Sequence, residues 1–246
     1  MTTRGSEAHS APSMPAPDAV WVQTDEAEGW TEMTRSGDVW EVAGAAVTVA
    51  PGEAGTAVAL EAPGASVRRV KLRWRQQLGA GVRILNDHWE RSYGDLEWRG
   101  IVPERVLPWY WLAYDGVRTD GYGVRTGAVA FCFWQADETG ISLWLDVRCG
   151  GVGVRLGGRR LEAATIVRRS GAESETPFAA AAALCRMLCD RPLLPAGPVY
   201  GGNNWYYAYG DSSHDNIVAD AAFMAALSSA PQAPLYGHRR RLAVRA

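Results

Sequence analysis

Aromatic and amide side chains crowd one short stretch of the chain, residues 198–210 (PVYGGNNWYYAYG). The amides of Asn203 and Asn204 can donate to and accept from hydroxyl groups, and Trp205 and Tyr206 offer ring faces for stacking. These are the groups with which a protein holds a sugar ring. We therefore predict a short buried strand that runs into a sugar-binding loop. The competing interpretation is that alternate side chains fill a barrel interior or a domain interface.

A second stretch, residues 86–98 (NDHWERSYGDLEW), mixes carboxylates with aromatic rings. Asp87, Trp89 and Asp95 are its candidate substrate contacts. Alternatively, Arg91 and Arg99 pair with the local carboxylates and fix a surface turn, which stabilises a protein only slightly.

The four cysteines follow no metal-binding or redox motif. Cys185 and Cys189 lie four residues apart on a predicted helix, while Cys132 and Cys149 lie on predicted strands. This spacing matches neither a zinc knuckle nor a CxxC motif. We therefore predict core thiols, and we expect neither a metal site nor a cofactor.

Short alternating runs dominate residues 19–170. In residues 67–75, Val70, Leu72 and Trp74 alternate with basic residues, which gives one apolar face and one basic face. The basic face could bind an anion, but a solvated sheet face is the preferred interpretation. Further strands are expected at 39–42, 45–50, 56–61, 109–114, 122–126, 128–135, 140–148, 152–156 and 159–167, the last two joined by a Gly-Gly hairpin turn. This pattern predicts a mainly β fold, with a large antiparallel β-sandwich over residues 19–170.

Helical signals appear only after this region. Thr176 is a plausible N-cap and Pro177 a first helical residue, so a helix is expected over 176–190. With the linker that follows, it fills residues 171–197. A second helix is expected at 215–228. The strand, loop and helix of residues 198–228 are typical of the first βα unit of a (β/α)8 barrel, whose loops after the strands carry active sites.

Composition narrows the remaining classes of function. Apolar residues make up 47% of the 246 residues, and the net charge is −2. This charge provides no electrostatic argument for nucleic acid or membrane partners. Residues 1–18 are rich in Pro, Ala and Ser and lack the apolar core of a secretory signal, so a disordered lead and a cytoplasmic location are expected.

The stretch Gly202-Asn203-Asn204-Trp205-Tyr206 resembles the first barrel strand of the melibiase-like glycoside hydrolases, the α-galactosidase clan. That family has a Gly-Trp-Asn-Ser-Trp type of motif, and here Asn203 replaces the first Trp. Residues 86–98 are similar to the loop that the family's amino-terminal β-sandwich extends over the barrel mouth. The order of sandwich, linking helix and barrel strand also agrees over residues 20–228.

The resemblance implies hydrolysis of an α-glycosidic bond with retention, by a nucleophilic carboxylate and an acid/base carboxylate. In the family these carboxylates stand at the ends of later barrel strands, so no catalytic residue is assigned in this chain. Residues 229–246 contain Pro231, Pro234 and three consecutive arginines, and we expect an atypical, disordered tail that reflects truncation or a lost reading frame. The alternatives are a basic tail that binds nucleic acid or anionic lipid, and a non-catalytic carbohydrate-binding β-sandwich.

Overall fold

The computed structural model describes residues 13–88, 96–197, 201–227 and 235–237. The part of the chain that the structure describes is mainly β, with 42% of its residues in strands and 15% in helices. The chain divides into two compact units, Met1–Asp190 and Arg191–Ala246.

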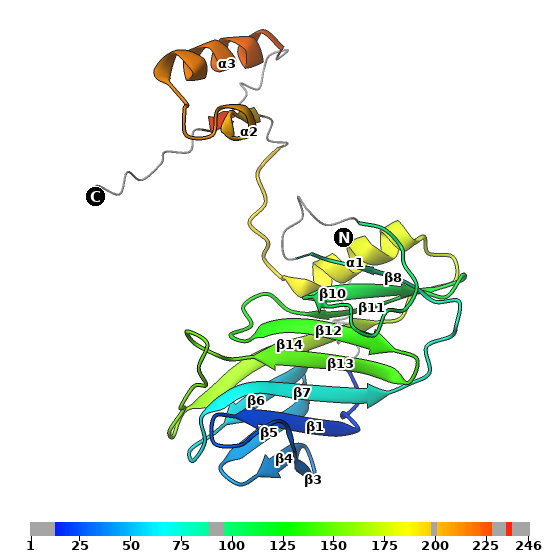
Figure 1. Ribbon diagram of the computed structural model, residues 1–246. Helices are drawn as coiled ribbons and strands as arrows, with labels where there is room; N and C mark the ends of the chain where they lie inside the picture. The colour runs from blue at the N-terminus through cyan, green and yellow to red at the C-terminus, as the bar shows by residue number, and fades with distance from the viewer. Residues whose placement is uncertain (1–12, 89–95, 198–200, 228–234, 238–246) are drawn as a thin grey trace, which may run out of the picture. The chain divides into compact units, whose positions relative to one another are not determined.

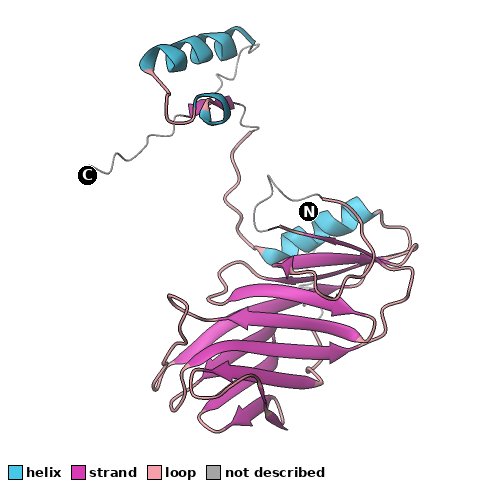
Figure 2. Cartoon of the chain, in the orientation of Figure 1, coloured by secondary structure: helices cyan, strands magenta, loops and turns pink. Residues whose placement is uncertain are grey.

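Two antiparallel sheets form the first unit (Figures 1 and 2). The six-stranded sheet has the order β2 (Thr31–Glu32), β1 (Ala19–Thr24), β7 (Val67–Arg75), β13 (Gly140–Asp146), β12 (Phe131–Asp137) and β9 (Leu107–Pro108). The eight-stranded sheet has the order β3 (Thr34–Ser36), β4 (Val39–Val42), β5 (Ala45–Gly52), β6 (Gly55–Glu61), β14 (Arg160–Arg169), β11 (Thr119–Val124), β10 (Tyr110–Tyr114) and β8 (Arg83–Asn86). The expected antiparallel β fold is thus confirmed for this unit.

One apolar core lies between the inner faces of the two sheets. Val70, Leu72 and Trp74 of β7 are buried in it, as their alternation with basic residues predicts. Trp111 of β10 stacks on Tyr122 of β11, with ring centroids 4.5 Å apart. Several tryptophans therefore fill the sandwich rather than line a binding surface.

The predicted hairpin of residues 152–156 and 159–167 is wrong. Val152 and Val154 make only isolated bridges, to Cys149 and Val67. The strand β14 pairs instead with β6 on one side and β11 on the other. The Gly157-Gly158 turn resembles a hairpin connection locally, but long-range pairing in the sheet determines the neighbours of β14.

The end of the expected disordered lead is also ordered. Met14 is 4% exposed, and its carbonyl oxygen accepts a hydrogen bond of 3.2 Å from Thr56 Oγ1. The carbonyl oxygen of Pro15 accepts one of 2.8 Å from Trp74 Nε1. Residues 13–18 therefore pack against the sandwich, because they satisfy buried polar groups that the strands leave unpaired. Residues 1–12 lie outside the described part.

Helix α1 (Pro177–Leu188) lies on the outer face of the eight-stranded sheet, over β10 and β11 (Figure 1). Thr176 Oγ1 accepts a hydrogen bond from Ala179 N, which confirms the predicted N-cap. Leu184 is fully buried against β10 and β14. Gly121 and Gly123 of β11 allow this close approach, because a Cβ atom at Gly123 would lie 2.6 Å from a methyl carbon of Leu188.

The second unit contains a parallel pair of strands, β15 (Gly201–Asn203) and β16 (Leu235–Gly237). Between them lie the short helix α2 (Trp205–Ala208) and helix α3 (His214–Leu227). The helix expected over 215–228 is confirmed. Two expectations are wrong: β15 is not buried, and part of the tail expected to be disordered forms β16. The local sequence pattern does not predict β16, because a strand of only three residues forms through its pairing with another strand, here β15.

The cysteines differ in their surroundings. Cys132 is buried in the sandwich, and its burial raises the pKa of its thiol to about 12. Cys149 and Cys185 are exposed and Cys189 is half-buried, so the prediction of a core thiol is correct only for Cys132.

Candidate functional site

Asp87, which the sequence analysis selected, lies at the rim of a cavity in the first unit. It directly follows β8, and its side chain is largely buried, with 7% of the residue exposed. The cavity has a volume of about 460 Å³, and its walls are mostly apolar. It lies where the carboxyl end of α1 meets the sheet, and is lined by Asp87, Trp109, Tyr110, Val124, Arg125, Thr126, Gly127, Ala128, Cys185, Leu188 and Cys189.

Local hydrogen bonds hold Asp87 in position. Its Oδ1 atom accepts a hydrogen bond of 3.0 Å from the backbone N–H of His88. Its own backbone N–H donates to the carbonyl oxygen of Tyr110 over 3.4 Å. The preceding Asn86 is buried, and its side-chain amide donates to the carbonyl oxygen of Asp87. The carboxylate is therefore fixed at the rim of the cavity before any ligand binds.

Trp109 forms one wall where the chain passes from one sheet to the other. It joins β9 of the six-stranded sheet to β10 of the eight-stranded sheet, and its φ angle is +59°. Its carbonyl oxygen accepts hydrogen bonds from Val124 N at 3.0 Å and Trp134 Nε1 at 3.3 Å. Its ring meets the ring of Phe131 edge to face, with centroids 5.6 Å apart. These contacts fix the indole at the cavity. They also hold the backbone of Trp109 at a positive φ angle, which a bulky residue rarely adopts.

Polar groups at the end of α1 complete the cavity. The guanidinium of Arg125 forms an ion pair with Asp190, and only 17% of the Arg125 side chain is exposed. The backbone N–H and the hydroxyl of Thr126 donate to the carbonyl oxygen of Leu188 at 2.9 and 3.2 Å. A mostly apolar cavity with a few fixed polar groups is the usual form of a small-molecule site.

Neither Trp109 nor Arg125 is a candidate from the sequence alone. Trp109 falls within the strand expected over 109–114, where it is one aromatic residue among many. Arg125 carries no motif, because its ion-pair partner Asp190 lies 65 positions further along the chain, just after α1.

The other two predicted contacts of this stretch, Trp89 and Asp95, lie outside the described residues. At the end of the same stretch, Arg99 forms an ion pair with Glu97, as the alternative interpretation of these charges expects. The Trp98 ring lies 5.9 Å from the Tyr114 ring of β10. This end of the stretch thus has a structural role.

The predicted contacts of residues 203–206 lie in the second unit, but not as a strand with alternating faces. The strand β15 ends at Asn203, and a helical turn begins at Trp205, so the expected shared face of Asn203, Trp205 and Tyr207 does not form. The reason is local, since Asn203 Oδ1 accepts a hydrogen bond of 3.0 Å from Trp205 N and turns the chain.

The side chains of this segment differ in what they offer to a ligand. Asn204 is 2% exposed, and its amide donates to Ser212 Oγ. Trp205 is half-buried and meets the Tyr209 ring at 5.8 Å. Tyr206 is 66% exposed, which leaves its ring free to stack. Tyr207 is also exposed, and its hydroxyl forms a hydrogen bond with Asp220 of α3.

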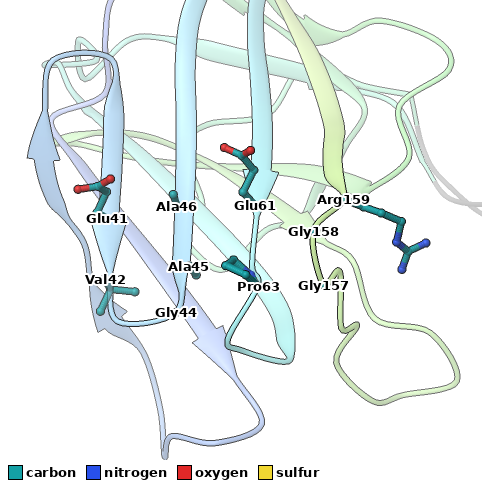
Figure 3. A pocket seen from close by; sticks show the side chains of 10 residues that line it. All are labelled: Glu41, Val42, Gly44, Ala45, Ala46, Glu61, Pro63, Gly157, Gly158 and Arg159. Carbon is teal, nitrogen blue, oxygen red and sulfur yellow. The ribbon is translucent and has the colours of Figure 1, made fainter.

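A second hollow of about 610 Å³ lies at one end of the eight-stranded sheet (Figure 3). Strand register places Ala46 between Glu41 and Glu61, so a small side chain separates two carboxylates. Both glutamates are exposed and solvated. Arg159 at the rim is also exposed, and its guanidinium donates to the carbonyl oxygens of Arg155 and Leu156. No residue predicted from the sequence lines this hollow.

Comparisons with protein-family models, with curated proteins and with solved structures found no match to this chain. Within the described residues, no group of three or more His, Cys, Asp or Glu side chains could hold a metal ion. In the same part of the chain, no helix is long and apolar enough to cross a membrane.

Proposed function

We propose that this chain is the amino-terminal portion of a retaining α-glycoside hydrolase of the α-galactosidase type, and that the Asp87 cavity binds a sugar. The observation that carries the proposal is the position of Asp87. A motif in the sequence selected this residue, and its buried carboxylate lies at the rim of a cavity walled by Trp109.

The chemistry of the cavity suits a sugar ring. The Asp87 carboxylate can accept hydrogen bonds from hydroxyl groups, and the Arg125 guanidinium can donate to them. The Thr126 hydroxyl donates its hydrogen to Leu188, so its oxygen can accept a hydrogen bond from a sugar. The indole of Trp109 supplies an apolar surface for the C–H face of the ring. Because these groups are already fixed, little entropy is lost when a ligand binds.

The second unit supports the proposed barrel. Parallel strands need a crossover connection, and β15, α2, α3 and β16 form such a unit. Repetition of this unit builds a (β/α)8 barrel. In the α-galactosidase clan the catalytic carboxylates follow later strands, so we expect this chain to position a sugar without cleaving a glycosidic bond.

Titration with methyl α-galactoside, followed by tryptophan fluorescence, tests the proposal. We expect saturable quenching, and about tenfold weaker binding for Asp87→Asn, because one charged hydrogen-bond acceptor is lost. Glu41→Gln, at the other hollow, is the matched control and should bind as the wild type does. Absence of saturable quenching would refute sugar binding. Turnover of an aryl α-galactoside that Asp87→Asn abolishes would refute the positioning role.

The alternative function is a non-catalytic carbohydrate-binding β-sandwich. It is favoured by one observation: all of the described residues that line the Asp87 cavity belong to the first unit. The substitutions Trp205→Ala and Tyr206→Ala distinguish the two functions. If the aromatic and amide side chains of the second unit also bind sugar, as the hydrolase proposal predicts, both substitutions weaken binding of methyl α-galactoside. If the sandwich is an independent binding module, neither changes it.

A further inference from the structure

A row of four side chains crosses the outer face of the six-stranded sheet. Strand register places Trp21 of β1 beside Lys71 of β7, Lys71 beside Trp144 of β13, and Trp144 beside Phe133 of β12. All four are half-buried. They point away from the core, because the residues next to them along each strand face it. Three strand spacings give this aromatic row a length of ~14 Å. Such a strip suits an extended chain better than a small compact molecule.

Contacts within the aromatic row fix its side chains. The rings of Phe133 and Trp144 are parallel to within 9°, with centroids 5.6 Å apart. Lys71 Nζ lies 5.2 Å from the Trp21 ring centroid and 4.8 Å from that of Trp144. Trp30 meets Trp144 edge to face at 5.2 Å and is 37% exposed. A ligand would therefore meet a rigid apolar surface and would not have to order it.

Lys71 forms no ion pair within the described residues, unlike the arginines that flank it on the same face. On either side of it along β7, Arg69 pairs with Asp146 at 2.9 Å and Arg73 pairs with Asp137 at 2.7 Å. The ammonium of Lys71 instead lies over the two indole rings. Partial burial, and secondarily the charge of Arg73, lower the pKa of Lys71, while the charge of Asp137 acts in the opposite direction. An anionic group on a ligand would supply the missing charge.

Hydrogen-bonding groups border the aromatic row. Gln23, Arg69 and Asp146 are in register on one side, and Arg73, Ser142 and Gln135 on the other. Ser142 is buried and accepts a hydrogen bond from Arg73, whereas the other five side chains are half-buried and can reach the hydroxyl groups of a ligand. A peptide could not add here as a further strand, because the backbone groups of β7 and β13 are already paired on both sides. In the described part of the first unit, the helix α1 covers only the opposite sheet (Figure 1).

We propose that the aromatic row binds a linear carbohydrate that bears carboxylates. Its sugar rings lie along Trp21, Trp144 and Phe133, and one carboxylate pairs with Lys71. The surface lies on a different sheet face from the Asp87 cavity, so this binding goes beyond the function proposed above and does not depend on it.

Affinity electrophoresis of the full chain in gels that contain polygalacturonate tests the proposal, with a neutral galactan as the comparison polymer. We expect polygalacturonate to retard the wild type, and Trp144→Ala and Lys71→Gln to weaken the interaction by about tenfold or more. Lys71→Arg should retain it, because the charge is kept. Phe178→Ala, which removes an exposed ring on α1, is the matched control and should behave as the wild type does.

Asp87→Asn separates this proposal from the first, since it should leave retardation by polygalacturonate unchanged. Near-ultraviolet circular dichroism identifies any variant that fails to fold. If Trp144→Ala does not fold, Trp144→Phe replaces it, and we expect a smaller loss of affinity for polygalacturonate because an aromatic ring is kept. Four results would overturn the assignment. In the gels, these are no retardation of the wild type by polygalacturonate, equal retardation by the neutral galactan, or undiminished retardation of Lys71→Gln by polygalacturonate. In sedimentation, it is a wild-type dimer that Trp144→Ala dissociates.

Discussion

The substitution Asp146→Asn is predicted to remove a charge interaction that joins two central strands of the six-stranded sheet. Asp146 ends β13, and its carboxylate accepts a hydrogen bond of 2.9 Å from Arg69 of β7. The guanidinium of Arg148 adds three more, one of 3.0 Å to Oδ1 and two of 3.1 and 2.7 Å to Oδ2, and its backbone N–H adds one of 3.1 Å to Oδ1. Only 13% of the Asp146 side chain is exposed. Solvent therefore screens these interactions weakly.

The pKa of Asp146 gives the size of the effect. Burial opposes ionisation, but the hydrogen bonds from Arg148 and Arg69 outweigh it and lower the pKa from 3.8 to about 2. At about 1.4 kcal/mol for each pKa unit, the ionised form stabilises the folded state by about 2 kcal/mol at pH 7. Because the folded pKa is lowered, this stability is present above the unfolded pKa and is lost as the pH falls towards 2. About half of it should remain at pH 3.

Urea unfolding followed by tryptophan fluorescence at pH 7, 4.5 and 3 measures this contribution. At pH 7 we expect the midpoint of Asp146→Asn to fall by about 1 M, for a slope of about 2 kcal/mol per M. The difference from wild type should shrink by about half at pH 3. Glu28→Gln, at an exposed carboxylate with no ion pair among the described residues, is the control. An equal loss of stability at pH 7 and pH 3 would refute the charge argument and indicate altered packing.

Two further predictions concern the helix α1 and the thiols. Leu184→Ala should lower the free energy of unfolding by about 2–5 kcal/mol, because it leaves a cavity where the fully buried Leu184 side chain packs on the sheet. Phe178→Ala, at a residue that is 84% exposed, should change it by no more than about 0.5 kcal/mol in the same urea titration. Iodoacetamide at pH 8 should label Cys149 and Cys185 but not Cys132, whose thiol is buried and has a pKa of about 12. Mass spectrometry of native protein tests this, and equal labelling of the three residues would contradict the burial of Cys132.

Local patterns in the sequence predicted much of the fold. The alternation in residues 67–75 gave both the strand β7 and its buried face, because side chains of a strand point alternately to its two sides. Thr176 and Pro177 located the start of α1, since capping depends on residues within one turn. Where a locally plausible turn competed with sheet pairing, as at Gly157-Gly158, the prediction of the hairpin was wrong.

The sequence by itself suggested candidate ligand contacts and determined which faces of the strands are apolar. It selected Asp87 and described the outward basic face of β7, because these properties belong to single residues or to neighbours along the chain. Only the tertiary structure decided that Asp87 shares a cavity with Trp109 and Arg125, and that Lys71 lies between two indole rings. Those arrangements depend on strand register and helix packing between segments that are far apart in the sequence, which no local pattern encodes.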